Sequence, residues 1–118
     1  AVGRIHSQGY TLGDTKPSNA IYYDSKIFLT DLEQAIPAGD RAWDLAEFLY
    51  YSAKLTLNTT GVKKITQAFL DGYLKYGSAN IIEKALSVKY LAPFQPLLAP
   101  TVLKAVRDGM ASRAGVKR

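Results

Sequence analysis

An acid, a lysine and an amide side chain lie close together in one polar loop of the sequence, at Asp14, Lys16 and Asn19. A further acid, Asp31, follows two short runs of β-forming residues that come directly after this loop. Antiparallel strands of similar length bring the residue before the first strand near the residue after the second, so we expect Asn19 and Asp31 to meet. Their amide and carboxylate oxygens are the ligands that Mg²⁺ takes from proteins, with phosphates and waters completing its octahedron.

The other two side chains supply the remaining parts of a phosphoryl-transfer site. Asp14 is free to accept the proton of an attacking hydroxyl group, and Lys16 can place positive charge on the phosphoryl group being transferred. The alternative is structural, because loops rich in Asp, Pro, Ser and Asn also occur for backbone reasons alone.

A β-hairpin over residues 20–30 is the element that must bring these groups together. Its strands are the runs Ala20–Tyr23 and Lys26–Thr30, and the polar pair Asp24-Ser25 forms the turn. A two-stranded hairpin is too small to be stable alone, so it must lie on the rest of the chain.

The rest of the chain is predicted to be mostly helical. Residues 1–8 have the weak apolar spacing of a helix end, and residues 31–39 are expected to form a loop. From Asp40, which can cap a helix, apolar residues recur at intervals of three and four. Three further helices are predicted at residues 62–76, at residues 81–91 after a capping box of Asn80 and Glu83, and at residues 102–111 after Thr101. The predicted fold is mainly α with a small β-hairpin.

Composition excludes several classes of protein and site. The chain of 118 residues has no cysteine, which excludes disulfide scaffolds, Cys-ligated zinc and thiol catalysis. Its single histidine, His6, excludes a multi-histidine metal site and is expected to be a packing residue. The first residues lack the basic flank and apolar stretch of a signal peptide, and no apolar run approaches the roughly 18 residues that span a bilayer. We therefore expect a cytoplasmic protein without a signal peptide or a membrane span.

The net charge of +5 is unevenly distributed along the chain. Acidic residues gather in the first 47 residues, whereas the last 18 are basic. Such a tail can bind RNA or an acidic partner protein, or it can be a solvated terminus. The residues that would make such a contact are Arg107, Arg113, Lys117 and Arg118.

The segment IHSQGYTLGDTKPSN, residues 5–19, resembles the catalytic loop of protein kinases, in which an Asp is followed by Lys at +2 and Asn at +5. TDLE, residues 30–33, stands where such kinases carry the metal-binding Asp-Phe-Gly triplet. GDRAWDLAEF, residues 39–48, is similar to the helix that follows in atypical kinases and in choline and aminoglycoside phosphotransferases. A turn formed for backbone reasons would not also require Asp31 and Asp44, so the combination favours the catalytic interpretation.

The resemblance implies the C-terminal lobe of a kinase-like phosphotransferase, with ATP and Mg²⁺ or Mn²⁺ as cofactors. It assigns Asp14 as the catalytic base and Lys16 as the cation that stabilises the phosphate. It also assigns Asn19 and Asp31 as metal ligands, and Asp44 as the buried acid that supports the catalytic loop. The chain then divides into a catalytic loop (9–19), a hairpin (20–30), a metal-binding segment (31–33), a helical part (40–112) and a basic tail (113–118).

Departures from the kinase pattern indicate which types of kinase the sequence resembles most. Leu12 stands in place of a largely structural histidine, and Asp31-Leu32-Glu33 replaces Asp-Phe-Gly. Residues 32–43 are too few for an activation loop, so the resemblance is better to short atypical kinases of the RIO and KEOPS types, or to small-molecule phosphotransferases. The sequence has no glycine-rich phosphate loop. We therefore expect the N-terminal lobe to be absent and this chain alone to be weak or inactive.

Three functions follow from these observations. The first is an atypical Ser/Thr protein kinase, which transfers phosphate from ATP to a hydroxyl group of a protein. The second is a small-molecule or lipid kinase of the choline or aminoglycoside phosphotransferase type. The third is a non-catalytic module that binds RNA or a protein complex through the basic tail. The sequence favours the first.

Overall fold

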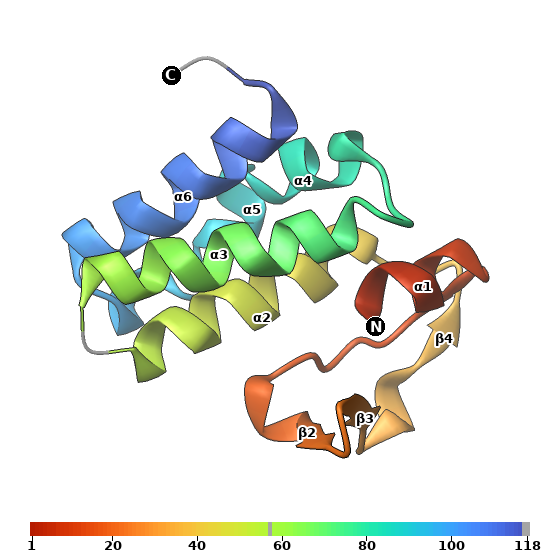
Figure 1. Ribbon diagram of the computed structural model, residues 1–118. Coiled ribbons are helices and arrows are strands. Elements are labelled where there is room, and N and C mark those ends of the chain that lie inside the picture. Colours follow the sequence, from red (N-terminus) through yellow and green to blue (C-terminus); the bar gives the residue numbers. More distant parts are fainter. Residues whose placement is uncertain (57, 117–118) are drawn as a thin grey trace.

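The computed structural model describes residues 1–56 and 58–116, and helices make up most of this part of the chain (Figure 1). The helices are α1 (Val2–Ser7), α2 (Arg41–Leu55), α3 (Thr59–Tyr73), α4 (Ala79–Ala85), α5 (Val88–Leu91) and α6 (Pro100–Ala114). The strands are β1 (Tyr10–Thr11), β2 (Ala20–Tyr23), β3 (Lys26–Leu29) and β4 (Ile36–Pro37), and the short 3-10 helices are η1 (Pro17–Asn19), η2 (Leu32–Gln34) and η3 (Gln95–Leu97). The prediction of a mainly α fold with a small β content is confirmed.

The core forms around α2, which packs against α3, α4 and α6. The apolar residues of α2 recur at three and four, and this face is buried. Asp40 caps the helix, because its carboxylate accepts a hydrogen bond from the backbone N–H of Trp43 at 3.2 Å. Tyr90 of α5 donates its hydroxyl proton to the same carboxylate, and this hydrogen bond links the start of α2 to α5.

The predicted hairpin is present as the pair β2–β3. Its register joins Ala20 to Leu29 and Tyr23 to Lys26. Asp24 and Ser25 have φ angles of 53° and 58°, and two residues with positive φ form the turn whose twist matches that of antiparallel strands. In Figure 1 the hairpin lies beside the helices, on the same side as α1.

A second, smaller sheet was not predicted. Residues 31–39 were expected to be loop, but β4 within them pairs with β1, with Thr11 opposite Ile36. The N–H of Ala38 also donates to the carbonyl oxygen of Gly9 at 2.8 Å. The segment from residue 9 to residue 38 is therefore closed at its ends, with the predicted catalytic loop, the hairpin and the predicted metal-binding segment inside it.

Some predicted helix boundaries were wrong. The segment 81–91 is not one helix, because α4 begins after Ser78 rather than Asn80 and a second helix, α5, begins after Ser87. The Ser87 hydroxyl accepts the N–H of Lys89 and so caps α5. The last helix begins at Pro100 rather than after Thr101, since proline is well suited to the first helical position. Among the described residues, no helix combines the length and the apolar character that a membrane span requires.

Candidate functional site

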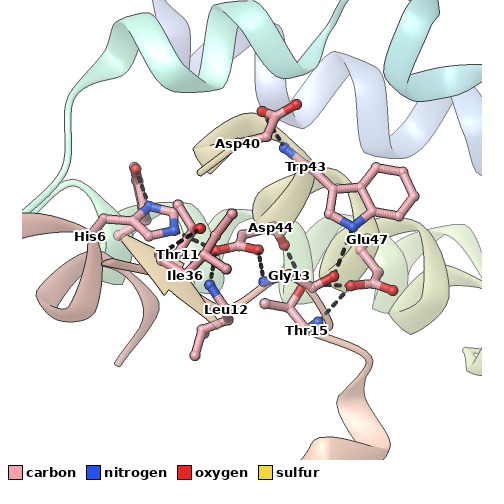
Figure 2. A network of polar contacts seen from close by, with 11 residues as sticks. His6, Thr11, Leu12, Gly13, Thr15, Ile36, Asp40, Trp43, Asp44 and Glu47 are labelled. Carbon is pink, nitrogen blue, oxygen red and sulfur yellow. Dashed lines mark hydrogen bonds and ion pairs between the residues drawn. The ribbon is translucent and has the colours of Figure 1, made fainter. Parts of the chain in front are cut away.

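The start of α2 holds the predicted catalytic loop by its backbone, and Asp44 is the centre of these contacts (Figure 2). Asp44 is fully buried. Its Oδ1 accepts the N–H of Gly13 at 2.8 Å, and its Oδ2 accepts the N–H of Leu12 at 2.8 Å. Oδ2 also lies 2.7 Å from Nε2 of His6. A buried carboxylate with three donors is well satisfied, and it fixes the two peptide groups that precede Asp14.

Two neighbours of Asp44 on α2 extend this support on either side of Asp14. The indole N–H of Trp43 donates to the carbonyl oxygen of Gly13 at 3.0 Å. Thr15 donates its backbone N–H to Oε1 of Glu47 at 2.6 Å and its hydroxyl proton to the carbonyl oxygen of Asp44 at 2.6 Å. Residues 12, 13 and 15 are therefore anchored to one face of one helix.

Gly13 is required where the loop passes the 3-10 helix η2. Its φ is +76°, a conformation that side chains disfavour, and a Cβ atom built there would lie 2.6 Å from the carbonyl oxygen of Gln34. This close approach places the segment after Asp31 against the predicted catalytic loop, although the two are separated by the hairpin in the sequence.

Three of the predicted site residues line one pocket of about 220 Å³. They are Asp14, Lys16 and Asn19, and the pocket continues between α3 and the hairpin along mostly apolar walls that include Phe48 and Phe69. Oδ2 of Asp14 lies 3.5 Å from Nζ of Lys16. The polar end of the pocket therefore holds a carboxylate group and an ammonium group of opposite charge.

Asp31 lies next to this group but does not line the pocket. The N–H of Thr30 donates to the carbonyl oxygen of Asn19 at 2.8 Å, so the backbone of Asn19 is paired with the residue before Asp31. Asp31 is exposed and has a φ of +56°, in the left-handed region. A non-glycine residue held in this conformation costs about 1–3 kcal/mol, and such residues cluster at functional sites.

The donor atoms of Asn19 and Asp31 suit Mg²⁺. Nδ2 of Asn19 donates to the carbonyl oxygen of Asp14 at 3.2 Å, which leaves its Oδ1 as the free atom of the amide group. An amide oxygen and a carboxylate are hard oxygen ligands, of the type and number that Mg²⁺ takes when phosphates and waters complete its coordination. Within residues 1–56 and 58–116, no three His, Cys, Asp or Glu side chains gather in a group that could hold a metal ion.

Sequence reasoning missed the contacts of His6, which was expected only to pack. Its Nδ1 lies 2.9 Å from the hydroxyl oxygen of Tyr73, in addition to the contact of Nε2 with Asp44. Burial raises the pKa of Tyr73 to about 12, so its hydroxyl is neutral and can donate. One signal was available: a fully buried histidine needs partners for both ring nitrogens.

Glu47 was also missed, although its spacing carried a signal. Residues three apart on a helix share a face, so Glu47 had to lie on the same side of α2 as Asp44. Burial raises the pKa of Glu47. The N–H of Thr15 lowers this pKa, and the neighbouring carboxyl group of Asp14 raises it further.

Two of the four basic residues predicted to contact a partner, Arg107 and Arg113, lie in the described part of the chain. Arg113 is paired with Asp71, with Nε 2.6 Å from Oδ1 and Nη2 3.3 Å from Oδ2. Arg107 is half-buried on α6. Lys117 and Arg118 lie outside the described residues.

Comparison with known proteins gave no match, whether among protein-family models, curated proteins or solved structures.

Proposed function

We propose that the chain carries the catalytic half of an ATP-dependent phosphotransferase, a cytoplasmic enzyme of the atypical protein-kinase type. The proposal rests on one observation: Asp14, Lys16 and Asn19 line a common pocket on a loop that α2 holds on both sides of Asp14. A loop formed only to connect two elements would need neither the buried acceptor Asp44 nor three polar residues that line one mostly apolar pocket.

In this proposal Asp14 accepts the proton of an acceptor hydroxyl group. The acceptor oxygen then forms a bond to the γ-phosphorus of ATP, the bond from this phosphorus to the bridging oxygen breaks, and ADP leaves with that oxygen. Lys16, 3.5 Å from Asp14, neutralises charge on the transferred group. Asn19 and Asp31 would hold Mg²⁺, which when bound compensates the charge of the ATP phosphates.

A small-molecule or lipid acceptor is the second candidate, and the pocket is the observation that favours it. Its walls are mostly apolar, and Phe48 and Phe69, which stack with ring centroids 4.3 Å apart, are among them. A volume of about 220 Å³ fits a small organic alcohol rather than a folded protein surface.

The test is transfer of label from γ-³²P-ATP by the chain at high protein concentration, because its activity is expected to be weak without a glycine-rich phosphate loop. A serine-containing protein and a set of small alcohols serve as acceptors. Asp14→Asn is expected to lower transfer by at least about a hundredfold, because general-base catalysis contributes this much. Asp24→Asn, at the exposed turn of the hairpin, is the matched control and keeps the activity. Transfer that is unchanged in Asp14→Asn contradicts the proposal, and the acceptor that takes the label decides between the two candidates.

A further inference from the structure

Glu47 lies next to the acid that the proposed function assigns as the base. It is only 6% exposed, and its Oε1 accepts the backbone N–H of Thr15 at 2.6 Å. Thr15 follows Asp14 in the chain, so this contact fixes the backbone on the C-terminal side of Asp14. The hydroxyl group of Thr15 adds little to it, because its single proton goes to the carbonyl oxygen of Asp44 at 2.6 Å and its distance to Oε1 is 3.4 Å.

The carboxyl group of Asp14 also lies close enough to Glu47 to raise the pKa of Glu47. Ionised carboxylates only accept hydrogen bonds, so a bond between two carboxyl groups requires a proton on one of them. With both groups ionised, the buried Oδ1 of Asp14 would have no donor among the described residues. The arrangement is therefore satisfied when the pair holds one proton.

The surroundings of the pair favour Glu47 as the protonated member. Glu47 is buried, and the group it faces is another acid, so its neutral form is preferred. Asp14 has the ammonium group of Lys16 3.5 Å from its Oδ2, a partner suited to a carboxylate. The nearest other acid on α2, Asp44, is already bound to His6 and to the loop N–H groups.

We propose that Glu47 is a positioning residue, whose protonated carboxyl group donates a hydrogen bond to Asp14 and holds this carboxylate in the pocket. The catalytic consequence rests on the proposed function, whereas the proton on Glu47 can be measured without any reaction. The contact makes the site sensitive to pH. When Glu47 loses its proton the donor disappears, and two negative charges face each other in a buried place.

The first test follows the side-chain carboxyl carbons of the whole chain by ¹³C NMR from acid to mildly alkaline pH. Glu47 is expected to titrate above 4.5, the ordinary value for Glu, and its midpoint is expected to fall in Asp14→Asn. Asp24→Asn, distant from the pair in the hairpin turn, is expected to leave that midpoint unchanged. Titration of Glu47 at or below 4.5, or a midpoint that does not respond to Asp14→Asn, overturns the proposal.

The second test compares Glu47→Met with Glu47→Gln in the phosphotransfer assay. The methionine removes both the donor to Asp14 and the acceptor of the Thr15 N–H, and it is expected to lower kcat by about tenfold with little change in KM, because both contacts position the base and not the substrate. The glutamine keeps a donor for Asp14 and an acceptor for Thr15, so it recovers most of that loss and removes the decline of activity at high pH. Equal losses in both variants overturn the positioning role. Full transfer by Asp14→Asn would instead overturn the proposed function, and the NMR result on Glu47 would stand.

Discussion

Replacing Asp44 by Asn changes one oxygen of a fully buried side chain into a donor and leaves its shape almost unaltered. Three donors now converge on the carboxylate, from His6, Leu12 and Gly13, at 2.7–2.8 Å. An amide oxygen can still accept the N–H of Gly13, but the amide nitrogen then faces two donors. His6 can respond by moving its proton to Nδ1, where the hydroxyl oxygen of Tyr73 can accept it.

The backbone N–H of Leu12 has no such alternative, and it becomes a buried donor without an acceptor. An unsatisfied buried group costs about 1–3 kcal/mol, and loss of the charge weakens the bond to Gly13 by roughly 1 kcal/mol more. We therefore expect Asp44→Asn to lower the free energy of unfolding by about 2–4 kcal/mol. Amide hydrogen exchange at Leu12 and Gly13 should accelerate more than exchange in α6, because the loop loses its anchor.

The measurement is urea unfolding of the variant and the parent chain, together with residue-specific hydrogen exchange. Asp71→Asn is the matched control, since Asp71 is an exposed helical acid paired with Arg113, and it should cost no more than about 1 kcal/mol. A loss for Asp44→Asn below that of Asp71→Asn, with unchanged exchange at Leu12, would refute the reasoning.

Three further predictions concern glycine contacts and high pH. Gly13→Ala should destabilise the chain and weaken Mg²⁺–ATP binding measured by calorimetry, because its Cβ would meet the carbonyl oxygen of Gln34 at 2.6 Å in a left-handed backbone. Gly3→Ala should lower the unfolding temperature without a direct effect on the loop, because its Cβ would lie 2.7 Å from the carbonyl oxygen of Tyr73. Burial raises the pKa of both Tyr73 and Tyr90 from 10.0 to about 12. The unfolded chain therefore loses these protons at lower pH than the folded chain, and the free energy of unfolding should fall between pH 10 and 12. The double variant Tyr73→Phe, Tyr90→Phe should show a smaller fall in unfolding scans.

The elements were largely predictable because their signals are local. The hairpin is encoded by two β-forming runs around a polar pair, and α2 by Asp40 and the spacing of its apolar residues. The pairing of β1 with β4 was not predictable, because strands of two residues are too short to show an alternating apolar pattern. The paired residues Thr11 and Ile36 are also 25 positions apart in the sequence. Neither α4 nor α6 begins with a side-chain capping hydrogen bond, so the capping signals at Asn80 and Thr101 did not mark their first residues.

The candidate site was predictable as a set of residue types but not as a network. The loop and Asp44 could be named from their order in the chain, whereas the contacts of His6 and Glu47 arise only when α2 packs beneath the loop. A buried polar residue is hard to distinguish from an exposed one in a single sequence, since its partners lie 32 to 67 residues away. Such residues are identified only when the fold is known and a hydrogen-bond partner can be assigned to each buried polar atom.

Binding of Mn²⁺–ATP to the isotope-labelled chain, followed by the paramagnetic broadening of backbone amide signals, tests the central claim most directly. Mn²⁺ substitutes for Mg²⁺ at oxygen ligands and broadens the signals of the residues nearest to it. The account predicts that broadening is strongest at Asn19 and Asp31 and weakest in α6. Broadening at Asn19 should be reduced in Asp31→Asn. Broadening centred on any other part of the chain, or none at a saturating concentration of Mn²⁺–ATP, would contradict it.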